Sequence, residues 1–202
     1  MEALRSRFAA AHTQPLAISV DSVYCHAAWG ESLGGISLPL LSDFHPKGAV
    51  ADRYGLYLAD KGITDRATVI IDAGGTVRHV SSVTPAGKRD IAELAALCEQ
   101  LDAAYDGPVA DPPPAPPGLP DNASLYVKDH CMFSRWALFA RRNLHLEDGL
   151  PVTNVSRDPA ALEHLRTVGG KPQAPALVCG SDVLYESKDI VDLMVRATQP
   201  AL

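Results

Sequence analysis

The chain has 202 residues, with 18 lysines and arginines against 24 aspartates and glutamates, which gives a formal net charge of −6 at pH 7. It has no basic block, which argues against a nucleic-acid partner, and no apolar run approaches the roughly 20 residues that cross a bilayer. A hydrophobic content of 47% predicts a globular protein with room for two small domains. Four scattered cysteines and no apolar secretory signal predict a reducing cytoplasm, in which thiols are catalytic or buried.

The first half of the chain predicts mixed helix and strand. Leu4, Phe8 and Ala11 recur at helical spacing, and Pro15 ends that first helix. The pattern then predicts a strand over residues 16–20, a helix over 22–33, a helical turn over 49–54, a central strand over 67–72, its hairpin partner over 76–80 and a helix over 88–105. Cys98 lies on the apolar stripe of the last helix, so we expect it in the core.

A proline-rich segment follows this first half. Residues 107–122 hold seven prolines, and this density excludes a helix or a central strand because proline has no N–H donor. The span favours an extended spacer over the alternative, a proline-rich ligand for an aromatic groove. We therefore predict a domain over residues 1–106, a linker over 107–122 and a second domain over 123–202.

The second half alternates strand and helix. The pattern predicts strands over residues 124–127, 152–155, 176–179 and 183–185. It predicts helices over 132–143 and 187–197, and a third helix that is capped by Asp158. This βαβ-then-αββα order is that of a minimal thioredoxin-like fold. Cys179 ends one of the buried strands, so we interpret it as a packing residue.

Cys131 is the best candidate for a reactive group. It follows a short apolar strand and precedes a predicted helix. A thiol at that position meets unpaired N–H groups and the positive end of the helix dipole, and both favour the thiolate. Lys128 adds a positive charge three residues earlier. We therefore expect a lowered pKa and a nucleophile at neutral pH; the alternative is a small buried apolar residue.

Three motifs in the second half occur in the order of one known group of proteins. The motifs are Lys128-x-x-Cys131-Met132-Phe133-Ser134, Ala174-Pro175 and Glu186-Ser187. Together they resemble, over residues 123–197, the glutaredoxins and the thioredoxin-like N-terminal domain of glutathione transferases. The resemblance implies that Pro175 is cis, that the loop at Ala174 presents backbone to the cysteinyl group of glutathione, and that Glu186 and Ser187 hold its γ-glutamyl end.

The same resemblance completes the predicted glutathione site with Lys128 and Ser134. Because Ser134 cannot close an internal disulfide, Cys131 is similar to the thiol of one-cysteine glutaredoxins and would work alone. Iron–sulfur carriage, known in one-cysteine glutaredoxins of Cys-Gly-Phe-Ser type, is an alternative. Met132 stands in the place of that glycine.

Residues 1–104 resemble the C-terminal two-thirds of a peroxiredoxin. The resemblance is carried by Ala17-Ile18-Ser19-Val20-Asp21-Ser22, His26-x-x-Trp29, Pro39-Leu40-Leu41-Ser42-Asp43-Phe44 and the segment from Gly62 to Asp72. It implies that Arg66 helps to hold a thiolate and peroxide oxygens. Cys25 is either a resolving thiol or a half-buried structural cysteine. The peroxide-attacking Pro-x-x-x-Thr-x-x-Cys motif is absent, and the resemblance places that cysteine upstream of Met1.

These patterns together predict an α/β protein with two thioredoxin-like domains, the first incomplete, joined by the proline-rich linker. The missing strands of the first domain would leave exposed strand edges that need cover. We therefore expect this domain to be marginal alone or to pair with another chain, for instance in a homo-oligomer.

The joint resemblance is to the bacterial hybrid peroxiredoxins. It predicts a glutathione-dependent thiol–disulfide oxidoreductase of antioxidant defence, with peroxide reduction only if a cysteine lies upstream of Met1. Glutathione is the expected co-substrate, and protein or small-molecule disulfides and peroxides are the expected partners. No metal is expected, because His26 and His45 have no further ligands at suitable spacing. A non-enzymatic glutathione-binding scaffold is the rival from another class.

Overall fold

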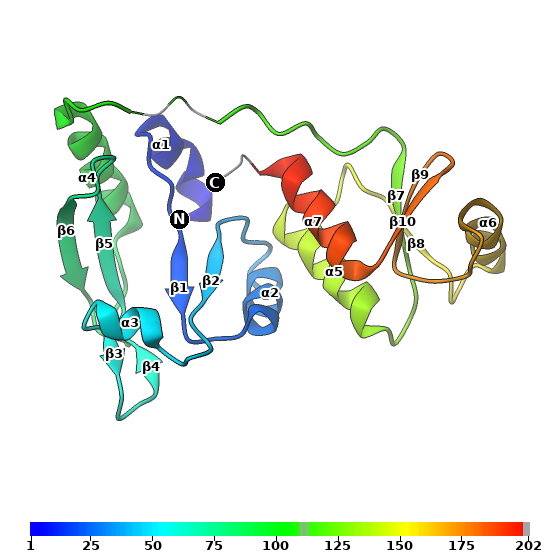
Figure 1. The fold of residues 1–202 in the computed structure, drawn as a ribbon, viewed down its shortest axis with the longest axis horizontal. Helices are drawn as coiled ribbons and strands as arrows, with labels where there is room; N and C mark the ends of the chain where they lie inside the picture. The colour runs from blue at the N-terminus through cyan, green and yellow to red at the C-terminus, as the bar shows by residue number, and fades with distance from the viewer. Residues whose placement is uncertain (110, 112, 200–202) are drawn as a thin grey trace. The chain divides into compact units, whose positions relative to one another are not determined.

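The computed structural model describes residues 1–109, 111 and 113–199 (Figure 1). The described chain forms two units, one of Met1–His26 with Leu38–Pro112 and one of Ala27–Ser37 with Pro113–Leu202. The described residues between 107 and 120 form neither helix nor strand, because the prolines supply no N–H groups to a ladder or a helix. The predicted boundaries at 106 and 123 stay predictions.

The first unit is built from short elements. They are a 3-10 turn η1 (Glu2–Leu4), α1 (Arg5–Ala10), β1 (Ala17–Ser19), β2 (Leu40–Ser42), α3 (Ala49–Arg53), β3 (Tyr57–Leu58), β4 (Ile63–Thr64), β5 (Ala67–Ile71), β6 (Val77–Ser82) and α4 (Ile91–Ala104). Helix α2 (Val23–Ser32) begins in this unit and continues into residues of the second. The strands pair as a parallel β1–β2 and as antiparallel β3–β4 and β5–β6.

The prediction that residues 67–72 form a central strand is wrong in one respect. They do form strand β5, but among the residues that the structure describes β5 pairs with β6 alone. Its β-branched residues favour an extended backbone, and that preference does not depend on how many neighbours the strand has. The strand is therefore an edge, as are β1 and β2.

The core of the first unit is small. Phe8 and Ala11, at the end of α1, pack against Ala95 and Cys98 of α4. Cys98 is 5% exposed, which confirms the prediction that it lies in the core. Its burial raises the pKa of the thiol above its ordinary value, although a hydrogen bond with Thr13 lowers it in part.

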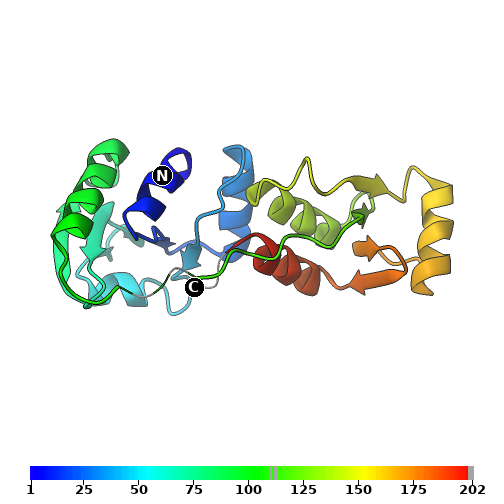
Figure 2. The ribbon, with the colours of Figure 1, turned by 90° about the horizontal axis from the view of Figure 1, so that it is seen from above.

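The second unit contains the predicted alternation of strand and helix. Its elements are β7 (Ala123–Val127), α5 (Met132–Asn143), β8 (Val152–Asn154), α6 (Pro159–Gly169), β9 (Ala176–Cys179), β10 (Asp182–Tyr185) and α7 (Ser187–Thr198). The sheet has the order β10-β9-β7-β8, with β7 parallel to β8 and antiparallel to β9. Helices α5 and α7 lie on one side of it and α6 on the other (Figures 1 and 2). No helix in the described part of the chain is long and apolar enough to cross a membrane.

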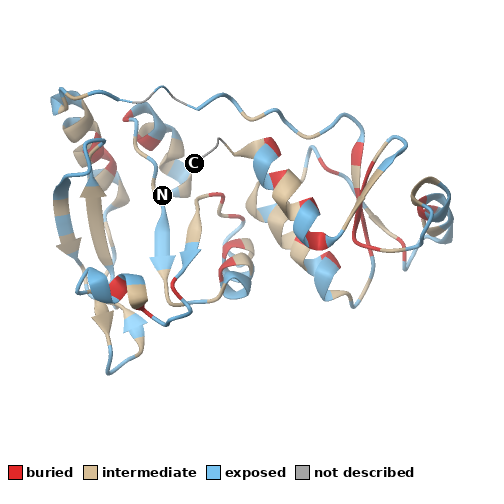
Figure 3. Cartoon of the chain, viewed as in Figure 1, coloured by how far each residue is buried: buried red, intermediate tan, exposed pale blue. Residues whose placement is uncertain are grey.

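Both faces of this sheet are buried, and alternate residues of each strand serve opposite faces. On β7, Ala123, Leu125 and Val127 face the core shared with α5 and α7, whereas Tyr126 faces the core shared with α6. On β9, Leu177 belongs to the first core. Buried segments accordingly follow β7 and β9 in Figure 3. Each fully buried leucine contributes about 1.5–3 kcal/mol through removal from water, which makes β7 and β9 a firm base for the loops at their ends.

The C-terminal end of α5 binds residues 27–37. Asn143 donates its side-chain N–H to the carbonyl of Ala27 at 3.0 Å, and its side-chain oxygen accepts from the N–H of Ile36 at 3.2 Å. Gly35 lies against the same helix end with φ of +105°, and a Cβ there would come within 2.5 Å of the carbonyl oxygen of Arg142. This position therefore requires a glycine.

Candidate functional site

Cys131 stands at the start of α5 as the residue that caps it. Its sulfur accepts a hydrogen bond from the backbone N–H of Ser134 at 3.4 Å, one of the N–H groups that have no partner within the helix. The preceding residue, His130, has a positive φ of 54°, which turns the chain from the end of β7 into the helix. The sulfur therefore takes the place that a serine or aspartate oxygen usually has at a helix start.

Several contacts act on the ionisation of the Cys131 thiol. Partial burial raises its pKa, but hydrogen bonds from the Ser134 hydroxyl and N–H, a hydrogen bond from the Phe133 N–H and the charge of Lys128 lower it, and the net shift is downward. The lowered pKa predicted from the position of Cys131 at a helix start therefore agrees with the structure. The thiolate is the species that attacks disulfides.

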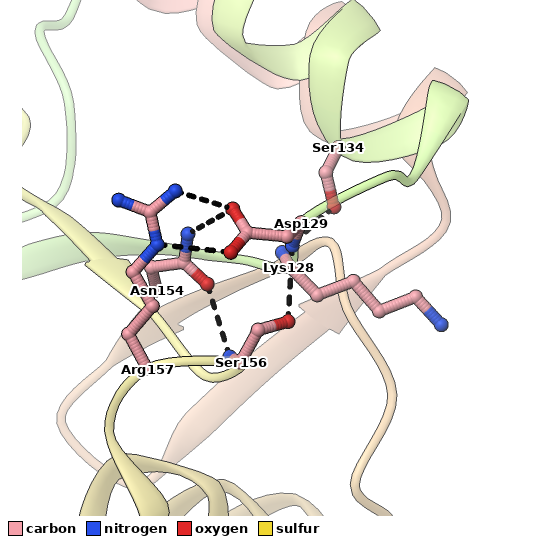
Figure 4. Close-up of polar contacts among 6 residues, drawn as sticks. All are labelled: Lys128, Asp129, Ser134, Asn154, Ser156 and Arg157. Atoms are coloured by element: carbon pink, nitrogen blue, oxygen red, sulfur yellow. Dashed lines mark hydrogen bonds and ion pairs between the residues drawn. The ribbon is translucent and has the colours of Figure 1, made fainter.

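Ser134 connects the thiol to the loop before it. Its side chain is 1% exposed, and its hydroxyl oxygen accepts a hydrogen bond from the backbone N–H of Lys128 at 3.2 Å. The side chain of Lys128 is exposed and points away from the neighbouring Asp129 (Figure 4). A buried hydroxyl therefore fixes the loop and at the same time donates to the sulfur.

We expect Ser134→Ala to raise the pKa of the Cys131 thiol, because the variant removes a hydrogen bond to the thiolate and leaves the N–H of residue 134 in place. The rate of alkylation of Cys131 should then reach its half-maximum at a higher pH than in the wild type. Peptide-resolved mass spectrometry after short iodoacetamide pulses measures this midpoint. Ser156→Ala, which removes the hydroxyl that accepts from the Asp129 N–H and leaves the sulfur's contacts in place, serves as the control; equal midpoints in all three chains would contradict the expectation.

The second predicted motif lies beside the thiol. The Sγ atom of Cys131 is 3.9 Å from the carbonyl oxygen of Ala174. The peptide bond between Ala174 and Pro175 is cis, as predicted, and both residues are buried. The cis bond between His45 and Pro46 in the first unit was not anticipated.

The third motif begins α7. Glu186 is the residue before the helix, with a positive φ of 67°, and Ser187 is its first residue and 6% exposed. The carboxylate of Glu186 accepts a hydrogen bond from the side-chain amide of Gln173 at 3.0 Å. Since Gln173 directly precedes Ala174, this bond and the contact between Cys131 and Ala174 bring the three motifs into one area.

A polar cluster beside this area was not predicted. Asp129 accepts two hydrogen bonds from the guanidinium of Arg157, at 2.9 and 3.0 Å, and one from the side chain of Asn154 at 2.8 Å. Its backbone N–H donates to the hydroxyl of Ser156 at 3.0 Å (Figure 4). The cluster ties the loop before Cys131 to the end of β8. Lys128-Asp129-His130, a polar triplet directly before the thiol, is the signal that could have drawn attention to it.

Two predicted site residues belong to the first unit. Arg66, just before β5, has an exposed side chain, and its backbone N–H donates to the carboxylate of Asp65 at 2.8 Å. Cys25 is exposed, with its sulfur 3.8 Å from a carboxylate oxygen of Asp21. The interpretation of Cys25 as half-buried is therefore wrong, because this turn of α2 leaves the sulfur in solvent. Its role as a resolving thiol stays a prediction.

The four free cysteines should differ sharply in reactivity. We expect Cys131 and Cys25 to be alkylated in the native chain, the first because of its lowered pKa and the second because of its exposure. Cys98 and Cys179 should react slowly until the chain unfolds, because burial raises the pKa of both thiols. Mass-spectrometric mapping of a time course with and without denaturant tests this order, and alkylation of native Cys98 ahead of Cys131 would refute it.

Within the described residues, no group of three or more histidine, cysteine, aspartate or glutamate side chains is placed to hold a metal ion. The expected absence of a resident metal stays a prediction.

Comparison with known proteins gives a match to the first part of the chain. Residues 1–80 match the model of the AhpC/TSA family, so the first 80 residues carry a peroxiredoxin-like domain. Alkyl hydroperoxide reductase E of Mycobacterium bovis is 40% identical over 75 residues, which are 37% of this chain and 48% of that protein. Peroxiredoxin-4 of Rattus norvegicus is 39% identical over 80 residues, 37% of this chain and 29% of that protein.

The chain thus spans about half the length of the first of these relatives and a smaller share of the second. Among solved structures, AhpC of Mycobacterium tuberculosis superposes with a TM-score of 0.45 and 28% identity, over 49% of this chain and 59% of that one. At this TM-score the superposition adds nothing to the sequence match.

Proposed function

We propose that the chain, whose first 80 residues carry a peroxiredoxin-like domain, is a glutathione-dependent thiol–disulfide oxidoreductase with Cys131 as its nucleophile. The observation that carries the proposal is the position of the Cys131 sulfur, which caps α5 with a lowered pKa and lies 3.9 Å from the Ala174 carbonyl. A partly exposed thiolate beside a cis-proline loop can attack an incoming disulfide.

The reaction proceeds in two exchanges. In the first, the Cys131 thiolate attacks the glutathione sulfur of a mixed disulfide; a bond between Sγ and that sulfur forms, the original S–S bond breaks, and the substrate leaves as a thiolate that takes a proton from solvent. In the second, the thiolate of a free glutathione attacks the glutathione sulfur bound to Cys131. The products are oxidised glutathione and the Cys131 thiolate. Ser134 has no thiol, so it cannot displace glutathione from Cys131 by forming an internal disulfide.

Glutathione offers one ammonium and two carboxylates, and the charges near Cys131 complement them. We assign the γ-glutamyl ammonium to the carboxylate of Glu186 and the neighbouring carboxylate to the N–H groups at the start of α7. The carbonyl of Ala174 accepts from the cysteinyl amide, and the exposed Lys128 suits the glycine carboxylate. Gln173 supports this arrangement, because its bond holds the Glu186 side chain on the side of the cis-proline loop.

The test compares two substrates. The first measurement is the reduction of a small glutathione mixed disulfide in the presence of glutathione. The second uses the same disulfide with cysteinylglycine in place of its glutathione moiety. We expect the glutathione form to be preferred, and Glu186→Gln to raise KM for that form alone. Glu163→Gln, which alters an exposed carboxylate on α6, is the control. If both disulfides are reduced equally well, the proposed dependence on glutathione is wrong. If neither is reduced, the chain is a binding protein and not an enzyme of this kind.

Peroxide reduction is a second candidate function, favoured by the AhpC/TSA match of residues 1–80 and by Arg66 in that segment. Arg66 carries no ion pair among the residues that the structure describes, and a guanidinium of this kind suits a thiolate and a peroxide. Because the chain lacks the motif with the peroxide-attacking cysteine, we expect peroxide consumption only where such a thiol is supplied next to Arg66. A cytoplasmic location and a homo-oligomer through this domain belong to the same proposal.

A further inference from the structure

A carboxylate lies close to the candidate nucleophile. Asp129 is two residues before Cys131, so the Cα atoms of the two residues are at most about 7 Å apart. The hydrogen bonds from Arg157 and then from Asn154 lower the pKa of Asp129 below its ordinary value. Asp129 is therefore ionised wherever the thiol titrates. An uncompensated negative charge at this distance disfavours a thiolate, so it would raise the pKa of the thiol.

The end of β8 and the turn after it hold this carboxylate. The guanidinium of Arg157 donates from Nε to one oxygen of Asp129 at 2.9 Å and from Nη2 to the other at 3.0 Å. The side-chain amide of Asn154 donates to the second oxygen at 2.8 Å. Figure 4 shows both side chains converging on Asp129. A guanidinium can make this two-pronged contact with a carboxylate, whereas an ammonium cannot.

Stability of the fold does not explain this ion pair. The side chain of Arg157 is 74% exposed and that of Asp129 is 32% exposed. Ion pairs with this degree of exposure contribute little to the free energy of unfolding, because water screens both charges. The pair has a larger effect on its immediate surroundings, since it places a positive charge against the one carboxylate that precedes the thiol by two residues.

We propose that Arg157 is a positioning residue for the Cys131 nucleophile, which holds the Asp129 carboxylate at the end of β8 and compensates its charge. The thiolate then forms beside the cation of Lys128 and not beside an uncompensated anion. Arg157 acts on the sulfur through Asp129 and touches no reacting atom. This inference rests on the proposed function, because that function makes Cys131 the nucleophile.

Other titratable side chains surround the thiol loop. Those on the loop itself, on the first turn of α5, before α6, in the cis-proline loop and before α7 include Lys128, His130, Arg135, Asp158, Lys171 and Glu186. All of them stay unchanged in the variants described below. A shift in the pH midpoint of the thiol therefore reports on Asp129 and Arg157.

The test measures the pH midpoint of Cys131 alkylation in the full chain, by peptide-resolved mass spectrometry after short iodoacetamide pulses. Arg157→Gln removes the guanidinium and leaves Asp129 ionised, so the midpoint should rise by about half a pH unit or more. Well above both midpoints the alkylation rates of the variant and the wild type should agree within about twofold, because the thiol is ionised in both.

The double variant Asp129→Asn with Arg157→Gln separates action through Asp129 from direct action on the sulfur. It removes both charges, so its midpoint should return to that of the wild type. Arg157→Lys keeps the positive charge without the two-pronged contact and should retain most of the wild-type midpoint. Arg166→Gln is the matched control: it breaks an exposed ion pair with Glu163 on α6 and should leave the midpoint unchanged.

Three results would overturn the proposal. The first is an equal midpoint in Arg157→Gln and the wild type. The second is a midpoint in the double variant as high as in Arg157→Gln alone, since Arg157 would then not act through Asp129. The third is slower alkylation of Arg157→Gln at every pH, which marks a purely structural tie. Alkylation requires neither glutathione nor turnover, so these results would leave disulfide exchange by Cys131 standing, and a wild-type chain without exchange activity would refute the proposed function alone.

Discussion

Cys131→Ser is expected to lower the rate of glutathione–disulfide exchange on the order of 10³-fold. A serine hydroxyl in the same place keeps the cap of α5 but is not ionised at neutral pH, so the variant loses the nucleophile and retains the fold. In the wild type the rate should rise with pH as the thiol ionises. Because the pKa of Cys131 lies below its ordinary value, the half-rise should lie at a lower pH than for an unperturbed thiol.

Cys25→Ser is the matched control, because it removes the other readily accessible thiol from the chain. It should leave the exchange rate and its pH midpoint as in the wild type. Retention of more than about a tenth of the rate in Cys131→Ser, or an equal loss in Cys25→Ser, would place the chemistry elsewhere. Circular dichroism of both variants verifies that the fold is intact.

Leu125→Ala is expected to destabilise the second unit by about 3 kcal/mol. Leu125 is fully buried in β7, in the core that this strand shares with α5 and α7. Truncation removes apolar surface and leaves a cavity, and such changes cost about 2–5 kcal/mol. Both tryptophans, Trp29 and Trp136, belong to this unit, so tryptophan fluorescence during urea titration reports its free energy of unfolding.

Val195→Ala on α7 is the control, since its side chain is 42% exposed. Loss of the β-branched side chain slightly favours the helix. Apart from that effect, the variant should change the free energy of unfolding by no more than about 0.5 kcal/mol. If Leu125→Ala and Val195→Ala shift the urea midpoint equally, the assignment of Leu125 to the main core is wrong.

The elements of the second unit were predictable because its signals are local. Asp158 before Pro159 marks the start of α6, and its carboxylate accepts from the N–H groups of Ala160 and Ala161 as a cap should. The apolar runs at β7 and β9 are long enough to identify buried strands. The three motifs of the candidate site were found in the same way, each from a short stretch of sequence.

The remainder of the site depends on contacts between distant residues. Asp129 and Arg157 are 28 positions apart, and no spacing rule connects an acidic residue before a helix with a basic residue after a strand. The bond between Gln173 and Glu186 is of the same kind. In the first unit, β3 and β4 are two residues long, too short for an alternating pattern, and the neighbours of β5 are set by segments far from it in the sequence.

The cap formed by Cys131 links the redox state of the protein to the stability of a helix. The reduced, ionised sulfur gives the first turn of α5 a charged acceptor for the N–H of Ser134, and the positive end of the helix dipole stabilises that charge. When the sulfur becomes part of a disulfide, the charge is lost while the N–H remains. The oxidised chain should therefore melt at a lower temperature than the reduced one, and the gap should close as the solution is acidified below the thiol pKa.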